Sequence, residues 1–212
     1  MELKIYNRSI SNTSSPYIIA EIGSNFDQSL KKAYKLINVA KSCGADAVKF
    51  QLFDGRTLYP NNKKMRKIFE KHQLNPEWIS TLKKYCNKIK IHFFLSVFDE
   101  KSLNVTLKNK IQLYKIASSE ITNLNLLKKI AMQKKPILVS TGMSDLDDVI
   151  RALKVTKSQK NNKIILMQCS SLYPLEDEKV NLNILDTFKK KFKCILGFSD
   201  HTLGYDAAIV AL

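Results

Sequence analysis

The chain has 212 residues, 44% of them hydrophobic, a length that suits one large domain spanning residues 1–212. Its formal net charge of +16 comes almost entirely from lysines scattered over polar helix faces, which argues against a nucleic-acid-binding protein while leaving a field that would attract a small anionic substrate. The sequence has no apolar stretch long enough for a membrane helix, no secretory signal and no CxxC pair, so we expect a cytoplasmic protein with no membrane partner and free, mostly buried thiols.

Short apolar runs recur along the chain, and each is followed by a segment of helical periodicity. This alternation is typical of βα units and predicts a parallel sheet. The predicted strands are Tyr17–Gly23, Ala47–Gln51, His92–Val97, Leu113–Ser118, Ile137–Thr141, Ile164–Cys169 and Ile195–Ser199.

Three of the intervening helices have recognisable ends. Gly44 follows the first helix as a left-handed C-terminal residue, and Ser144 is the expected N-cap of the third, with Asp147 in a capping-box-like position. The predicted helices are Leu30–Lys41, Leu124–Gln133 and Leu146–Val155.

The segment Leu52–Tyr85 is far longer than one crossover helix requires. It contains two helical stretches, Lys64–Lys71 and Pro76–Cys86, joined by a turn. We interpret it as an elaborated loop on the rim of the fold.

Seven βα units favour an α/β fold of the (β/α)8 TIM-barrel type over a doubly wound sheet, whose first turn usually carries a glycine-rich fingerprint. The last βα unit is missing, because the chain ends at Asp206–Leu212, which resembles the start of the helix after strand seven. A barrel without that unit would have two unpaired strand edges, so we expect the chain to be a fragment of a longer protein.

Charged residues inside apolar strands are the best candidates for chemistry, because Glu and Lys are seldom buried without a partner or a ligand. Glu21, Lys49 and Lys115 meet this criterion. They could simply pair with one another as an internal ion-pair network. With nearby hydroxyls they also form a set of donors suited to a phosphate and a carboxylate. These hydroxyls belong to Ser118, Ser140, Thr141 and Ser199.

His201 follows Asp200 just beyond the last predicted strand, where an imidazole could ligate a metal ion or transfer a proton. One histidine and one carboxylate do not complete a metal shell, and a lone histidine is more often structural. His72 and His92 are expected at a surface-helix position and at a strand start.

Several motifs in order resemble one family. YIIAEIG, CGADAVKFQLF, YKIASSEITNLNLLKKIA, KKPILVSTGMSDLDDV, QCSSLYPLEDEKVNLN and GFSDHTLG are similar to segments of the sialic acid synthases and of their relatives that make legionaminic and pseudaminic acids. The resemblance spans nearly the whole chain.

The resemblance implies a barrel enzyme that joins C3 of phosphoenolpyruvate to the C1 aldehyde of an N-acetylated hexosamine such as N-acetylmannosamine. The reaction would release phosphate. The resemblance also implies that the enzyme uses a divalent metal, manganese in preference to magnesium. By position it implies catalytic roles for Glu21, Gln51 and Glu120, and sugar contacts for Asn25 and Tyr173. It implies a metal ligand at His201. The implied phosphoenolpyruvate-binding residues are Lys49, Ser96, Lys115, Ser118, Ser171 and Ser199.

The chain also departs from the family pattern. Phe26, Asp27 and Gln28 stand where His-Asn-Gly is usual, which removes a polar side chain from the first loop, and Ser96 is the best substitute for a phosphate contact that the third strand usually supplies. The second metal histidine of the family, on strand eight, and the antifreeze-like domain that completes a homodimer are both absent. We therefore expect the 212-residue chain alone to be inactive.

Three alternatives remain open. The sugar could be a diacetamido-trideoxy hexose, as in legionaminic or pseudaminic acid synthesis. The chain could instead be an inactive fragment or a non-catalytic sugar-phosphate-binding protein. A nucleic-acid-binding module is the weakest candidate.

Overall fold

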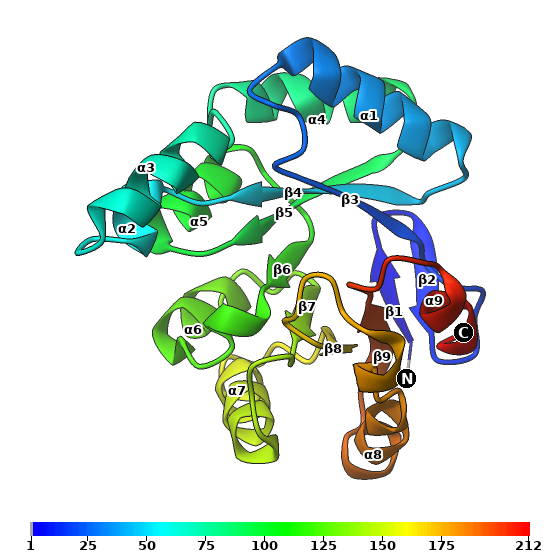
Figure 1. Ribbon diagram of the computed structural model, residues 1–212. Helices are drawn as coiled ribbons and strands as arrows, with labels where there is room; N and C mark the ends of the chain where they lie inside the picture. The colour runs from blue at the N-terminus through cyan, green and yellow to red at the C-terminus, as the bar shows by residue number, and fades with distance from the viewer. Residues whose placement is uncertain (1) are drawn as a thin grey trace. The chain divides into compact units, whose positions relative to one another are not determined.

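The computed structural model describes residues 2–212 and divides the chain into two compact units (Figure 1). One unit is continuous and spans Tyr17–Tyr114; the other is discontinuous and combines the segment up to Pro16 with Lys115–Leu212. The expectation of a single domain stays a prediction. Among the described residues, no helix is both long enough and apolar enough to cross a membrane.

The continuous unit contains three parallel strands in chain order and the helices that follow them. The strands are β3 (Ile19–Gly23), β4 (Ala47–Leu52) and β5 (His92–Val97). The helices after these strands are α1 (Leu30–Ser42), α4 (Trp78–Lys88) and α5 (Glu100–Lys108). α1 packs against α4 and against β3 and β4, as Figure 1 shows. The buried faces of these helices repeat every three to four residues, as amphipathic helices require.

The long segment between β4 and β5 is helical for most of its length. α3 (Lys63–His72) and α4 confirm the two predicted helical stretches, whereas the short α2 (Gly55–Leu58) was not predicted, because one turn has no detectable periodicity. His72 is the last residue of α3 and His92 the first of β5, as expected.

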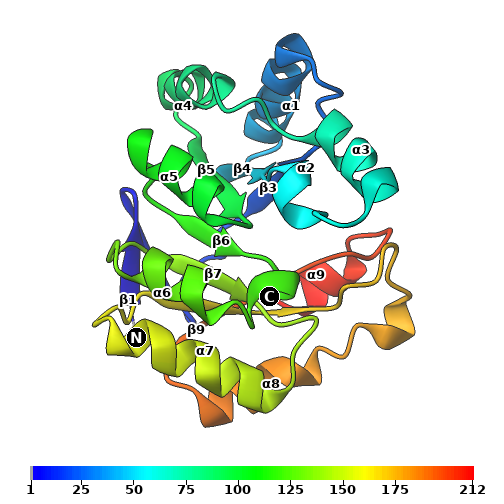
Figure 2. The same ribbon diagram turned by 90° about the vertical axis from the view of Figure 1, so that its left-hand side faces the viewer.

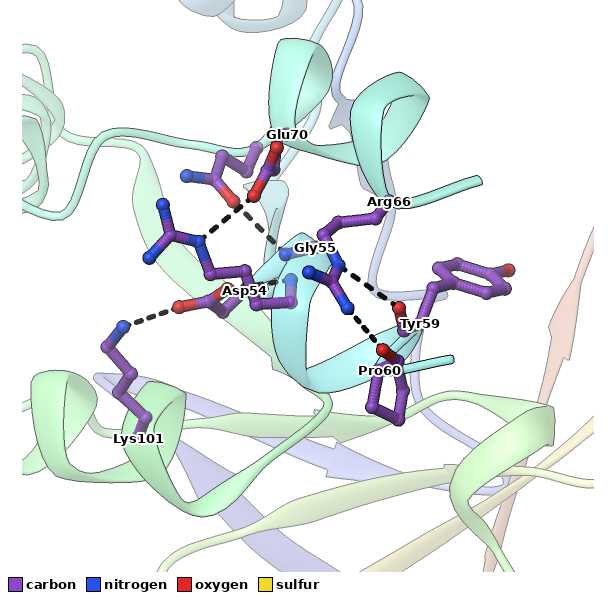
Figure 3. A network of polar contacts seen from close by, with 9 residues as sticks. Asp54, Gly55, Tyr59, Pro60, Arg66, Glu70 and Lys101 are labelled. Carbon is purple, nitrogen blue, oxygen red and sulfur yellow. Dashed lines mark hydrogen bonds and ion pairs between the residues drawn. The ribbon is translucent and has the colours of Figure 1, made fainter. Parts of the chain in front are cut away.

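A network of polar contacts holds α2 against α3 (Figure 3). Arg56 Nε donates to Glu70 Oε1 over 3.1 Å, and Gly55 N–H donates to Gln73 Oε1 over 3.1 Å. Arg66 donates to the carbonyl oxygens that end α2, at Tyr59 and Pro60. An ion pair with Lys101 in α5 lowers the pKa of the Asp54 carboxyl. The segment that was predicted as an elaborated loop on the rim is therefore a helical insert, and polar contacts hold its helices together.

The discontinuous unit begins with an antiparallel hairpin that was not predicted. β1 (Glu2–Ile5) pairs with β2 (Arg8–Ser11) in the register Leu3↔Ile10, and both of these side chains are buried. Four-residue strands are too short for alternation alone to identify them.

The same unit continues with four adjacent strands in chain order, and the pairs β7–β8 and β8–β9 are parallel. These strands are β6 (Tyr114–Ile116), β7 (Ile137–Ser140), β8 (Ile164–Cys169) and β9 (Ile195–Ser199). The boundary between the two units falls inside β6, after Tyr114. The helices are α6 (Leu124–Ala131), α7 (Leu146–Ser158), α8 (Asn183–Lys191) and α9 (Asp206–Val210). α6 and α7 pack against each other, as Figure 2 shows. All six residues of β8 are buried, as is usual for a parallel strand covered on both faces.

The predicted helix ends were right in one case and wrong in another. Gly44 follows α1 with a φ of +83°, which confirms the left-handed residue. The N-cap of α7 is Asp145 rather than Ser144: its carboxylate accepts from Asp148 N–H over 2.8 Å, and the Asp148 carboxylate accepts from Asp145 N–H over 3.2 Å. Ser144 instead donates to Thr141 O, which removes its side chain from the helix end.

Candidate active site

The ends of the strands in the continuous unit bring together four predicted site residues. Lys49 on β4 is 8% exposed, forms an ion pair with Glu21 on β3 and donates to Ser96 Oγ on β5 over 3.1 Å. The parallel register explains this grouping, because it aligns Glu21 with Lys49 and Gln51 with Ser96. For Glu21 and Lys49 the ion-pair interpretation is confirmed.

Gly23 separates the side chains of Glu21 and Gln51. A Cβ atom at Gly23 would lie 3.4 Å from Glu21 Oε1 and 3.7 Å from Gln51 Nε2, so both polar groups border the same small space. The φ of +55° at Gly23 also favours glycine. A carboxylate and an amide lie here beside a buried ammonium, which is an arrangement suited to holding water or moving a proton.

In the first loop of this unit, Phe26 stands where the family resemblance predicts a polar side chain, and its packing explains this difference. Phe26 is fully buried, and its ring lies 5.9 Å from the Phe50 ring and 6.3 Å from the Trp78 ring. Phe26 therefore anchors the loop in the core. Gln28 donates to Gln73 O over 2.8 Å, which ties the loop to the helical insert. Asn25 is exposed beside this anchor.

A second group of predicted residues lies in the discontinuous unit, around Lys115. Lys115 is 5% exposed, and its Nζ atom lies 3.5 Å from Met167 Sδ. Burial lowers the pKa of this ammonium to about 8. Across residues 2–212 no carboxylate forms an ion pair with Lys115, so the ion-pair interpretation is wrong for this residue. A buried cation without a carboxylate partner is expected to bind an anionic ligand.

The predicted hydroxyl groups of this unit differ in whether they already have a hydrogen-bond partner. Ser118 Oγ accepts from Gly142 N–H over 3.0 Å. Thr141 Oγ1 already donates to Met167 O over 3.0 Å. Ser140 Oγ is buried and has no hydrogen-bond partner within the described chain, so it is the hydroxyl best able to donate to a ligand.

His201 is held by two hydrogen bonds that define its tautomer. Nδ1 lies against Ser170 O, which can only accept, so Nδ1 carries the proton. Nε2 is then the acceptor for the Tyr173 hydroxyl, 2.8 Å away, and the two rings stack with centroids 4.0 Å apart. Leu175 N–H donates to His201 O over 2.9 Å and fastens the loop. His201 could ligate a metal through Nε2 only after the Tyr173 hydroxyl moves away, because this nitrogen has a single lone pair.

Cys169, the last residue of β8, belongs to this group although it was not predicted as a site residue. Its Sγ atom lies 3.9 Å from His201 Nε2. Burial acts to raise the pKa of the thiol, but His201, Ser118 and Lys115 outweigh it and lower the pKa to about 7. Its place at the carboxyl end of a strand is the sequence signal for this role, whereas the spacing of the four cysteines bears only on disulfides and zinc sites. The thiols are free, and only Cys43 is exposed, as expected.

Three remaining predicted residues lie at strand or loop ends. Ser199 ends β9 and aligns with Cys169. Ser171 follows β8 and is partly exposed. Glu120 lies in the 3-10 turn Ser118–Glu120 and accepts from Asn123 Nδ2 over 3.2 Å.

The donor set for a metal is incomplete. His201 fits one position of a metal shell, with Cys169 beside it, yet residues 2–212 contain no cluster of three or more His, Cys, Asp or Glu side chains that could hold a metal ion. A stable site for a first-row metal needs more ligands than these.

Residues 36–212 match the model of the NeuB family. The chain belongs to this family. It is 34% identical to N,N'-diacetyllegionaminic acid synthase of Legionella pneumophila over 89% of this chain and 58% of that protein. It is 31% identical to pseudaminic acid synthase of Campylobacter jejuni over 92% of this chain and 61% of that protein. The first relatives are matched over 57% to 63% of their own length.

The fold is also that of a solved family member. The crystal structure of N-acetylneuraminic acid synthetase from Leptospira borgpetersenii, in complex with citrate, matches with a TM-score of 0.96 and 29% identity, over 100% of this chain and 74% of that chain. The predicted α/β class of the TIM-barrel type is confirmed, with seven parallel strands among the described residues.

Proposed function

We propose that the whole protein to which this chain belongs condenses phosphoenolpyruvate with an N-acetylated hexosamine, producing a nonulosonic acid and inorganic phosphate. The observation that carries the proposal is Lys115, a buried ammonium with no carboxylate partner among residues 2–212 and with only the Cys169 thiol as a nearby group of opposite charge. In a member of the NeuB family, a phosphate or carboxylate of the substrate is the natural counter-ion.

The residues of the discontinuous unit suit anion binding. The Lys115 ammonium supplies the charge, the free Ser140 hydroxyl supplies a donor, and Ser118 is oriented by Gly142 N–H. Ser171 and Ser199 are proposed as further contacts to phosphoenolpyruvate. Tyr173 is exposed beside His201, where it would face the sugar.

The residues of the continuous unit suit proton transfer. In the proposed reaction C3 of phosphoenolpyruvate bonds to the aldehyde carbon, the aldehyde oxygen takes a proton, water adds at C2, and phosphate leaves. Glu21, with its exposed carboxylate, and Gln51 would orient that water. Lys49, which pairs with Glu21 and donates to Ser96, is proposed together with Ser96 as a contact to phosphoenolpyruvate. Glu120 and Asn25 are proposed to act on the sugar.

We also propose that the whole protein uses a divalent metal, manganese in preference to magnesium, with His201 as one ligand. A bound divalent ion would polarise the aldehyde as a Lewis acid. The residues described here provide only part of the shell, so the contribution of this chain is the oriented Nε2 lone pair of His201.

The choice of sugar defines the alternatives. Relatives named for legionaminic and pseudaminic acid synthesis match at 34% and 31% identity, so a diacetamido-trideoxy hexose is the competing substrate. The candidate of another class is a non-catalytic sugar-phosphate-binding protein, which would bind phosphoenolpyruvate at Lys115 without turning it over. Phosphate release from the whole protein with manganese, phosphoenolpyruvate and each sugar in turn separates these candidates, since only a synthase releases phosphate.

The binding role of Lys115 can be tested by calorimetric titration of the whole protein with phosphoenolpyruvate. Lys115→Gln should weaken binding at least about tenfold, because a charge-assisted hydrogen bond in a buried place is lost. Lys154→Gln, which removes an exposed lysine from α7, is the matched control and should bind as the unaltered protein does. Equal affinity in both variants would refute the proposed phosphate site.

A further inference from the structure

A pocket of about 250 Å³ lies in the discontinuous unit, at the opposite ends of the strands from the candidate active site. It is bordered by the last turns of α7, the start of β8 and the segment that enters β9. Ile164 begins β8 and Cys169 ends it, so the pocket and the His201 group are separated by roughly 16 Å along the strand. The lining residues are Leu153, Lys157, Asn162, Ile164, Phe192, Lys193 and Cys194.

The floor of the pocket is apolar and firmly held. Leu153, Ile164 and Cys194 are buried. Cys194 O accepts from Asn12 Nδ2 over 3.1 Å, and Leu196 N–H donates to Asn12 Oδ1 over 2.8 Å, which fixes the backbone on the β9 side. The volume of about 250 Å³ limits an occupant to a small molecule of one or two rings.

The rim of the pocket is strongly positive. The two segments that form it, 151–163 and 187–194, contain nine Lys and Arg residues and no Asp or Glu. Lys157 and Lys193 line the pocket itself, and neither has an ion pair or hydrogen-bond partner for its ammonium in the part of the chain that the structure describes. Burial raises the pKa of the Cys194 thiol while the Lys157 ammonium opposes this, as expected for an ammonium positioned over the pocket.

We propose that this pocket is a second binding site, for a small organic anion that has an apolar ring and a carboxylate, sulfonate or phosphate group. The ring would lie against the partly exposed Phe192, with the buried side chains of Leu153 and Ile164 beneath it. The anionic group would lie between Lys157 and Lys193. Lysine ammoniums act here as point charges that accept any of these anions. The site does not depend on the proposed synthase activity.

The probe for the test is 2-naphthalenesulfonate, titrated into the whole protein and followed by calorimetry and by amide chemical shifts. Saturable binding with shifts at Ile164 and Cys194 is expected. Two related molecules isolate the two parts of the ligand. Methanesulfonate has the charge without the ring, and 2-naphthalenesulfonamide has the ring without the charge. Each should bind at least about fivefold more weakly, since it lacks one of the two contributions.

Two double variants supply the matched comparison. Lys157→Gln with Lys193→Gln removes the charges that line the pocket and should weaken the probe about three- to tenfold, the range for two partly exposed ion pairs. Lys154→Gln with Lys160→Gln lowers the net charge equally, from exposed positions on the same helix end that do not line the pocket. It should change the affinity less than twofold.

Three results would overturn the proposal: equal losses in the two double variants, equal binding of methanesulfonate, or shifts confined to residues outside the pocket. The first two would mean that the chain attracts anions through its overall charge alone, and the third that the probe binds elsewhere. Circular dichroism on both double variants confirms that any loss of binding is not a loss of fold.

Discussion

Lys115 shows how one residue can couple binding to stability. Its pKa of about 8, lowered by burial from 10.5, means that the folded chain holds this proton less tightly than the unfolded chain does. Between these two pH values the unfolded state binds more protons, so the contribution of Lys115 to stability should increase as the pH rises from about 8 to about 10.5. Below pH 8 the buried charge costs on the order of 3 kcal/mol.

Replacing Lys115 with methionine should therefore stabilise the fold at pH 7 while removing phosphoenolpyruvate binding. Methionine has a similar length and no charge to bury. We expect a gain of about 1–3 kcal/mol in the free energy of unfolding, measured by urea denaturation at pH 7, and a smaller gain at pH 10. Lys154→Met, at an exposed position, should change stability by less than about 0.5 kcal/mol. A destabilised Lys115→Met variant would show that the ammonium has a stabilising partner.

The helices share an unusual way of ending. α1 ends before Gly44, but α4, α5 and α7 end before a lysine with a positive φ at the equivalent place, two residues beyond the last helical residue. These lysines are Lys90 (φ +58°), Lys110 (φ +52°) and Lys160 (φ +54°). A left-handed conformation costs a residue with a side chain roughly 1–2 kcal/mol, and glycine avoids most of this cost.

Lys90→Gly should therefore stabilise the chain by about 0.5–1 kcal/mol, because relief of the left-handed strain exceeds the added freedom of glycine in the unfolded state. Its backbone carbonyl, which accepts from Lys41 Nζ, is retained. The same substitution at Lys84, exposed in the interior of α4, should have the opposite sign and cost about 1 kcal/mol. Urea denaturation midpoints of the two variants provide the measurement. Destabilisation by both would mean that the side chain of Lys90 stabilises the end of α4.

At the scale of the whole chain, Asn12 joins segments more than 180 residues apart. Its side chain contacts Cys194 O and Leu196 N–H on either side of Ile195, where β9 begins. This pairing satisfies backbone groups on β9 that would otherwise face solvent.

Asn12→Ala should reduce the free energy of unfolding by about 1–2 kcal/mol, because two hydrogen bonds to the backbone are lost. Amide exchange at Leu196 should accelerate as well. Thr13→Ala alters the adjacent exposed residue and should leave exchange at Leu196 unchanged. If amide exchange at Leu196 remained equally slow in Asn12→Ala, the segment that follows the β1–β2 hairpin would not contribute to the stability of β9.

The local pattern of the chain was sufficient to predict all seven parallel strands, and three of them, β5, β8 and β9, to the residue. It missed β1, β2 and α2, which are too short to show a period. It placed the N-cap of α7 one residue early, because Ser144 and Asp145 are both good capping residues and only the backbone geometry distinguishes them.

The sequence by itself determined the βα order, the family and the polar residues at the strand ends, because these depend on neighbours along the chain and on motifs. Only the tertiary structure decided what those residues contact. Glu21 neutralises Lys49, Lys115 has no such partner, Cys169 joins His201, and Phe26 lies in the core. The physical reason is that a buried charge is defined by groups distant in sequence, whose positions follow from packing and strand register rather than from local propensity.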